Sequence, residues 1–137
     1  MGTADLELSF PPLPQYVRVA RHVVGWMARM RDVPEPCVDD VRLLASEACT
    51  NAMVANQEAA SDEPVVMRAG EDNGTLTIEV LDRGSEPPRP IVDFEVDTGE
   101  MAFEKGTWLA VVQGVADDWS VEPRDGGGSS LKATLYF

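Results

Sequence analysis

An acid and an amide lie inside a helix-like pattern in the segment LLASEACTNAMVAN, residues 43–56. Glu47 and Asn51 are four positions apart, so a helix would place them on nearly the same side, about 6 Å from each other. A carboxylate and a carboxamide arranged in this way can contact one ligand together. The pair therefore predicts a functional site, and the alternative is that both groups face solvent at the edge of the helix.

A second polar motif, Asp82-Arg83-Gly84, follows the strand-like residues TIEVL. A carboxylate at the end of a strand can accept a hydrogen bond from an exocyclic amine such as that of adenine, and glycine lets a flat ring approach the main chain. The motif therefore predicts a ligand contact, although an Asp-Xaa-Gly sequence after a strand also occurs in ordinary turns.

The third motif is the segment GTWLAVVQGVADDW, residues 106–119, in which a glycine precedes a predicted helix. Free backbone N–H groups and the positive end of the helix dipole can bind phosphate at such a position. Each of the three motifs is common when it occurs alone. Their order and spacing together are typical of a nucleotide-binding domain.

Apolar periodicity and turn residues indicate the elements that must position these motifs. The expected order along the chain is strand 5–10, helix 14–30, helix 37–58, strands 64–69 and 75–81, loop 83–105, helix 106–117, and strands 119–123 and 130–137. The Asn73-Gly74 pair predicts a hairpin between the two central strands. This order predicts an α+β fold in which one mixed, mostly antiparallel sheet carries the helices on one face.

The chain has the size and composition of one domain, residues 1–137, because 44% of its residues are hydrophobic and can form a single core. Trp26 and Met30 are expected to pack into that core. No apolar stretch approaches the roughly 18 residues of a membrane span, and the N-terminus lacks a signal-peptide pattern. Cys37 and Cys49 would lie roughly 18 Å apart along one helix, too far to pair, and reduced thiols fit a cytoplasmic protein.

The charge is strongly acidic, with 24 Asp and Glu residues against 11 Lys and Arg residues and a formal net charge of −13. Nucleic-acid-binding proteins normally present a basic face, so direct binding to DNA or RNA is not expected. The same charge would attract a basic surface of a partner protein. The alternative is that it serves solubility alone.

The motifs SEACTNA, residues 46–52, and GTWLAVVQGVADDWSV, residues 106–121, resemble those of the GHKL ATPases, the superfamily of gyrase, the heat-shock chaperone and histidine kinases. Within it they look most like the anti-sigma factor serine kinases of bacteria. The resemblance covers nearly the whole chain and implies the Bergerat fold, a two-layer α/β sandwich, with ATP and Mg²⁺ as cofactors. It also implies a cytoplasmic regulator of stress-response transcription, often a homodimer in this family, whose partners are a sigma factor, an anti-sigma factor antagonist, or both.

The resemblance implies a role for each matching residue. Glu47 would be the general base that takes the proton of an attacking serine hydroxyl, and the side-chain oxygen of Asn51 would bind Mg²⁺. The other nucleotide contacts would come from Asp82 and Gly84 at adenine, Gly106 and Thr107 at the phosphates, and Ser129 near adenine in place of the family's threonine. Residues 84–105 would form the lid over ATP.

Two positions depart from the family pattern in the glycine-rich motifs. Glu86 and Trp108 stand where the family usually has glycine, and the indole of Trp108 would fill space that the triphosphate needs. Six acids, against only Arg89 and Lys105 as basic residues, lie in the segment from Gly84 to Lys105, so the lid would repel the anionic nucleotide. These departures predict that Mg-ATP binds weakly or not at all.

Two functions therefore stay open at the level of sequence. The first is an ATP-dependent serine kinase that phosphorylates an anti-sigma factor antagonist and sequesters a sigma factor. The second is a non-catalytic binding module that keeps the fold and a partner surface but has lost productive nucleotide binding. The catalytic part of a histidine kinase is less favoured, because 137 residues leave no room for a dimerisation helix pair.

Overall fold

The computed structural model describes residues 4–84 and 109–137, and residues 1–3 and 85–108 lie outside this description. The described elements are β1 (Leu6–Phe10), α1 (Pro14–Met30), α2 (Glu35–Glu58), β2 (Val65–Asp72), β3 (Thr75–Leu81), a helical segment over residues 109–115, β4 (Asp118–Pro123) and β5 (Ser129–Tyr136). They follow in the order predicted from the sequence. The predicted loop 83–105, with its lid, falls almost entirely outside the described residues.

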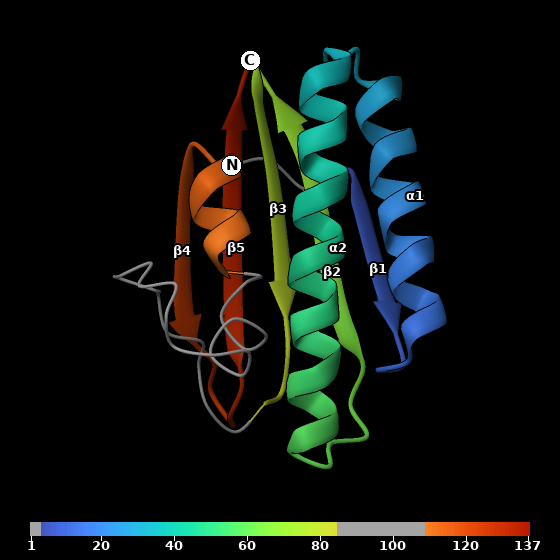
Figure 1. Cartoon of the computed structure of the whole chain (residues 1–137), viewed down its shortest axis with the longest axis vertical. Helices are drawn as coiled ribbons and strands as arrows, with labels where there is room; N and C mark the ends of the chain where they lie inside the picture. The colour runs from blue at the N-terminus through green and yellow to red at the C-terminus, as the bar shows by residue number, and fades with distance from the viewer. Residues whose placement is uncertain (1–3, 85–108) are drawn as a thin grey trace, which may run out of the picture.

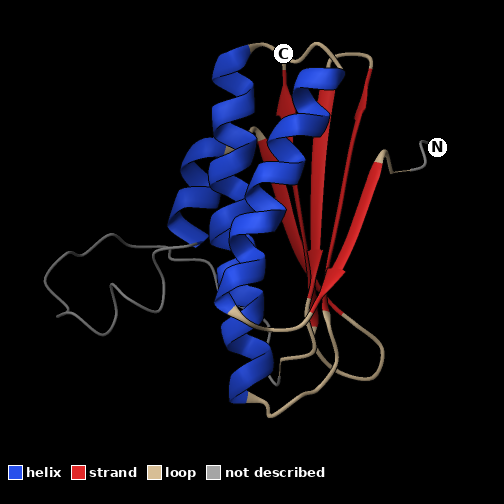
Figure 2. Cartoon of the chain, turned by 90° about the vertical axis from the view of Figure 1, so that its right-hand side faces the viewer, coloured by secondary structure: helices blue, strands red, loops and turns tan. Residues whose placement is uncertain are grey.

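The strands form one sheet in the order β1-β2-β3-β5-β4, and each neighbouring pair is antiparallel. The helices lie together on one face of this sheet, as Figures 1 and 2 show. The predicted α+β fold with two layers is therefore confirmed. The sequence predicts a mixed, mostly antiparallel sheet, and within the described strands the sheet is antiparallel throughout.

The two long helices both have a proline in the first turn. Pro14 is the first residue of α1, and Pro36 is the second residue of α2. Proline suits these positions because its missing N–H would have no partner inside the helix. Since Glu35 and Pro36 already belong to the first turn, α2 begins two residues before the predicted start at Cys37.

The hairpin between β2 and β3 turns at Asn73 and Gly74, whose φ angles are 49° and 83°. Both angles are left-handed, as a two-residue Asn-Gly hairpin turn requires. The hairpin predicted from the sequence is therefore confirmed. It fixes the pairing of β3, the strand that ends directly before Asp82.

The core lies between the sheet and the helix layer and is built from buried aliphatic side chains of both. Trp26 and Met30, predicted to lie in this core, are instead 62% and 65% exposed. Together with Val19 they follow one side of α1, away from the buried Ala20 and Val24. Because α1 packs against α2 and the β1–β2 end of the sheet, its outer side stays uncovered.

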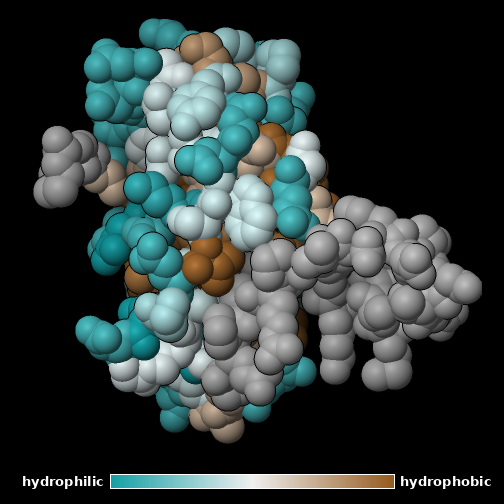
Figure 3. All heavy atoms as spheres, turned by 90° about the vertical axis from the view of Figure 1, so that its left-hand side faces the viewer, coloured by the Kyte–Doolittle hydropathy of each residue, from teal (hydrophilic) through white to brown (hydrophobic). Residues whose placement is uncertain are grey.

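The edge strand β4 presents hydrophilic side chains. Asp118, Ser120 and Glu122 are exposed, and the strand ends at Pro123. Figure 3 shows the described part of this side of the molecule as largely hydrophilic. Charges and proline at a sheet edge discourage pairing with another chain. None of the described helices is long and apolar enough to cross a membrane.

The two cysteines are both free, as their predicted separation requires. Burial raises the pKa of the Cys49 thiol to about 12. Burial also raises the pKa of Cys37, and the negative charges of Asp40 and Asp117 add to that effect. Both thiols are therefore protonated near neutral pH, and neither is an activated nucleophile.

Candidate functional site

The carboxylate of Asp82 is held in one orientation at the end of β3, where it is 5% exposed. Its Oδ1 accepts hydrogen bonds from the backbone N–H of Gly84 at 2.7 Å and from that of Ser129 at 3.3 Å. Its Oδ2 accepts one from the Ser129 hydroxyl at 3.1 Å. A carboxylate has about four acceptor positions. Among the described residues, one position on Oδ2 is therefore left for a donor such as an exocyclic amine.

Gly128 allows β5 to approach Asp82 this closely. Its φ is +94°, and an added Cβ would lie 2.0 Å from the carbonyl oxygen of Asp82. That carbonyl accepts a hydrogen bond from Arg124 Nη1 at 2.8 Å, and the N–H of Asp82 donates to the carbonyl of Ser129 at 2.9 Å. Asp82 and Ser129, both singled out from the sequence, are therefore in direct contact although 47 positions apart.

Gly84, the last residue of the Asp82 motif, lies against α2. An added Cβ at Gly84 would come within 2.7 Å of the Cβ of Ala55. No side chain fits at this position without moving the helix or the loop. The motif is therefore seated on α2 at the level of Ala55, one helical turn beyond Asn51.

Asn56, which the sequence did not predict, is the polar link between α2 and the Asp82 motif. Its side chain is 0% exposed. Its Oδ1 accepts a hydrogen bond from the N–H of Arg83 at 2.7 Å, and its Nδ2 donates to the carbonyl of Glu63 at 3.0 Å. The sequence did contain a signal for it. Asn56 follows the buried Ala52 by four residues, so the helical spacing places this amide on the buried stripe of α2.

Glu47 and Asn51 lie on α2 in line with Ala55, at successive intervals of four residues. Both side chains are half-buried. Because Ala55 touches Gly84, Asn51 lies about 6 Å and Glu47 about 12 Å along the helix from that contact. A ligand that starts at Asp82 and follows α2 would meet Asn51 before Glu47.

The residues predicted to contact phosphate fall outside the described part of the chain. These are Gly106 and Thr107. Glu86 and Trp108, which depart from the family pattern, also lie outside the described residues. The described half of the candidate site is the end that contains Asp82 and Ser129. The arrangement of the phosphate half stays a prediction.

Two arginines flank Asp82 and are engaged with the protein itself. Arg83 pairs with Glu63 at 3.1 Å and donates to the carbonyl of Asp125 at 2.7 Å. Burial lowers the pKa of the Arg124 guanidinium, and the positive charge of Arg83 adds to this effect. Positive charges beside a buried carboxylate offset part of the cost of its burial.

The described residues fit the adenine end of a nucleotide. Asp82 offers an acceptor position for the adenine amine, and Gly84 packs against Ala55 beside it. Within the described ranges, no three His, Cys, Asp or Glu side chains gather into a group that could hold a metal ion. Mg²⁺ is often bound through one or two protein oxygens together with waters and substrate phosphates. The amide of Asn51 can supply one such oxygen.

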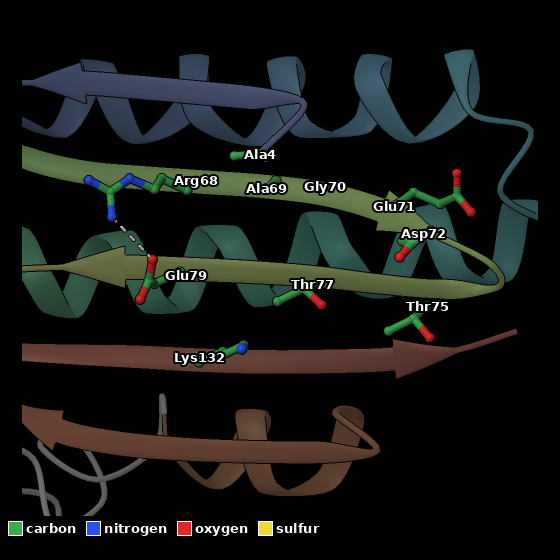
Figure 4. A pocket seen from close by; sticks show the side chains of 10 residues that line it. All are labelled: Ala4, Arg68, Ala69, Gly70, Glu71, Asp72, Thr75, Thr77, Glu79 and Lys132. Atoms are coloured by element: carbon green, nitrogen blue, oxygen red, sulfur yellow. Dashed lines mark hydrogen bonds and ion pairs between the residues drawn. The ribbon is translucent and has the colours of Figure 1, made fainter. Parts of the chain in front are cut away.

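A hollow of about 480 Å³ lies on the outer face of the sheet, opposite the helices (Figure 4). Arg68 in its wall pairs with Glu7 at 2.6 Å and with Glu79 at 3.4 Å. Lys132 stands opposite Glu79 in the strand register. These side chains form a ladder of alternating charge across the sheet, which stabilises strand pairing. They do not converge on a ligand.

Comparison with known proteins identifies the class of this domain. Residues 10–135 match the family described as the histidine kinase-like ATPase domain, and the chain belongs to that family. It is similar to the anti-sigma F factor of Thermoanaerobacter sp. (strain X514), at 28% identity over 141 residues that cover 98% of this chain and 95% of that protein. It is also similar to the serine-protein kinase RsbW of Bacillus licheniformis, at 30% identity over 79 residues that cover 58% of this chain and 49% of that protein.

A solved structure shares the fold. In the crystal structure of the SiaB-SiaC complex from Pseudomonas aeruginosa, one chain superimposes with a TM-score of 0.71 at 10% identity, covering 96% of this chain and 89% of that chain. At this identity the likeness concerns the fold alone. The resemblance to the histidine kinase-like ATPases and to the anti-sigma factor kinases, which the motifs predicted, is confirmed.

Proposed function

We propose that this chain is a cytoplasmic regulator that controls a bacterial sigma factor by partner switching and uses ATP to phosphorylate a serine of an anti-sigma factor antagonist. Its similarity to an anti-sigma F factor and to the serine-protein kinase RsbW supports the regulatory role. The observation that supports nucleotide binding is the Asp82 carboxylate. Three hydrogen bonds from described residues fix it, and those residues leave one acceptor position for an amine.

In this proposal the residues of α2 act next to the group that Asp82 positions. Asp82 accepts a hydrogen bond from the adenine amine, and the ring lies beside Gly84. Asn51, one turn along α2, provides an oxygen for Mg²⁺. Glu47, one turn further, accepts the proton of the serine hydroxyl as it attacks. ATP with Mg²⁺, when bound, supplies the phosphoryl group.

A second candidate is a non-catalytic module that binds a sigma factor or an antagonist without productive use of ATP. Two residues of the glycine-rich motifs favour it. Glu86 adds a negative charge and Trp108 adds a large ring where the family usually has glycine. In this case the adenine end would be retained as a piece of the fold, and Mg-ATP would bind weakly or not at all.

Nucleotide binding separates the two candidates. Mg-ATP is titrated into the full chain and followed by isothermal calorimetry. A kinase gives a strong, saturable signal that Asn51→Ala removes, whereas the non-catalytic module gives a weak signal or none. Glu86→Gly combined with Trp108→Gly should strengthen binding, because the pair restores room and removes a charge. If the double variant gains nothing, these two residues are not what weakens the site.

Partner capture tests the regulatory role itself. The tagged chain is used for a pull-down from the native host, and a captured sigma factor or antagonist is the expected result. With a captured antagonist, Glu47→Ala should abolish phosphate transfer to its serine and leave the complex intact. Glu58→Ala, which removes an exposed acid at the C-terminal end of α2, is the matched control. Capture of neither kind of partner would exclude the regulatory role, and loss of the complex in Glu47→Ala alone would make Glu47 a structural residue.

A further inference from the structure

α1 is a basic element in an acidic chain. Its sequence PQYVRVARHVVGWMARM contains three arginines and no acid, whereas the whole chain has a formal net charge of −13. A strongly acidic chain does not need such a helix for solubility. The positive charge of α1 is therefore to be explained by what its arginines face.

The arginines of α1 differ in their partners. Arg29 pairs with Glu35 at 3.1 Å. Arg18 and Arg21 form no ion pair with any residue of the described ranges. The Nε of Arg21 is also buried without a hydrogen-bond acceptor there. A buried charged donor without an acceptor is costly, and in native proteins a bound water or ion usually explains it.

Arg18 and Arg21 line a hollow of about 300 Å³ between α1 and α2, here called the α1–α2 hollow. The two helices lie side by side over the sheet (Figures 1 and 2). From α2, the hydroxyl-bearing Ser46 and Thr50, four residues apart, line the same hollow. Its wall also has an apolar part from Val17 and Met53. The hollow therefore combines two cations, two hydroxyl groups and an apolar surface.

No acid lies among the residues that line the α1–α2 hollow within the described ranges. Glu47, the acid next to Ser46 in the sequence, projects about 100° away from it around the helix. Arg18 and Arg21 are three residues apart on one helix face, where like charges destabilise each other. An anion in the hollow would offset this repulsion and would accept the hydrogen bond that Arg21 Nε can donate. A water molecule would satisfy only the second need.

We propose that the α1–α2 hollow binds the oxyanion of a small phosphate-bearing molecule, with Arg18 and Arg21 as the charged contacts and Ser46 and Thr50 as hydroxyl donors. Guanidinium groups present planar sets of N–H donors that match phosphate oxygens. A phosphate offers more acceptor oxygens than a carboxylate, and all four side chains can donate. The volume of about 300 Å³ is at the lower end of small-molecule pockets, roughly 300 to 1,000 Å³. The apolar part of the wall suits a short organic group.

This site is separate from the one at Asp82 and does not depend on the proposed kinase function. The Asp82 carboxylate only accepts hydrogen bonds, whereas the α1–α2 hollow is lined by donors. The two sites also lie on different sides of α2, because Thr50 faces α1 and Ala55 touches Gly84. Failure of phosphate to bind would therefore leave the nucleotide proposal as it stands.

Inorganic phosphate is the first probe. The Tm of the full chain should rise with phosphate concentration beyond the rise in chloride at the same ionic strength. In NMR spectra the Nε–H signal of Arg21 should move as phosphate is added. Glycerol 3-phosphate, tested in the same way, separates the two sources of the oxyanion. Tighter binding of the ester assigns the hollow to a phosphate monoester, and equal or weaker binding assigns it to the free anion.

Single substitutions then test the named contacts. Arg18→Gln and Arg21→Gln should each weaken phosphate binding about tenfold or more, because each removes a charged hydrogen-bonding group. Thr50→Val, which keeps the shape and removes a hydroxyl, should weaken it severalfold. Arg29→Gln is the matched control, since Arg29 lies on the same helix but pairs with Glu35, and it should leave binding unchanged. A phosphate effect no larger than that of chloride, or one that Arg18→Gln and Arg21→Gln reduce no more than Arg29→Gln does, would overturn the proposal.

Discussion

The end of β3 and the α1–α2 hollow differ in whether their buried polar groups have hydrogen-bond partners among the described residues. At the end of β3, the buried side chains of Asp82, Ser129 and Asn56 are hydrogen-bonded to one another or to the backbone. In the hollow, Arg21 keeps a buried N–H that finds no acceptor in the described part of the chain. A network with all its partners holds one shape, whereas donors without acceptors are costly until a ligand arrives. Substitutions should therefore reduce stability at the first region and ligand binding at the second.

The largest effect is expected at Gly128. Gly128→Ala should lower the free energy of unfolding by about 4 kcal/mol, because the new Cβ would collide with the carbonyl of Asp82 and because L residues disfavour its positive φ. Urea unfolding followed by circular dichroism measures this change.

Gly127→Ala is the matched control for that substitution. Gly127 has φ +102°, similar to that of Gly128, but an added Cβ would meet nothing within 4 Å. Only the backbone cost of about 1 kcal/mol is therefore expected. Equal losses in the two variants would mean that the contact with Asp82 contributes nothing to the requirement for glycine.

Asn56→Ala should have the next largest effect and lower the free energy of unfolding by about 3 kcal/mol. It removes both hydrogen bonds of a buried side chain and leaves the N–H of Arg83 and the carbonyl of Glu63 without their partner. Gln57→Ala removes one exposed hydrogen bond, to the carbonyl of Pro12, and should cost about 0.5 kcal/mol. Thermal and urea unfolding of both variants measure these losses. Equal losses for Asn56→Ala and Gln57→Ala would contradict the comparison.

Ser129→Ala should lower the free energy of unfolding by about 1.5 kcal/mol, since it removes the hydroxyl donor to the buried Asp82 carboxylate. Ser130→Ala is the control on the same strand, because its hydroxyl bonds to the half-buried Glu79, and it should cost about 0.5 kcal/mol. If both variants lose the same amount in urea unfolding, burial does not make the Asp82 contact special.

Arg21→Met should have the smallest effect on stability, within about 0.5 kcal/mol of zero in phosphate-free buffer, because it removes a buried donor that has no acceptor among the residues the structure describes. Arg83→Met, whose guanidinium is engaged with Glu63 and two carbonyls, should cost about 1 kcal/mol or more. A larger loss for Arg21→Met than for Arg83→Met would remove the contrast between the two regions.

Local sequence signals predicted most elements because they act within a few residues. α1 has the predicted bounds Pro14–Met30, set by proline at its start and by helical spacing of apolar residues. Trp26 and Met30 were placed wrongly, since periodicity shows which residues share a side of a helix but not how much of that side its neighbours cover.

The sequence predicted several residues of the candidate site but not the contacts between them. Asp82 and Ser129 were identified by their place in family motifs, and the structure brings them together. Asn56 was missed because no motif marks it, and its value comes from reaching the backbone of Arg83 across 27 positions. Such a contact has no signature in the residues next to either partner.

By itself, the sequence determined the order of helices and strands, the Asn73-Gly74 turn and the motifs of the histidine kinase-like ATPase family. Only the tertiary structure decided that Asn56 joins α2 to the Asp82 motif and that Arg18 and Arg21, which form no ion pair with the described residues, line the α1–α2 hollow. The physical reason is the distance along the chain over which each interaction acts. Backbone preferences act between neighbours along the chain, whereas these contacts depend on how helices and sheet pack, which many weak interactions decide together.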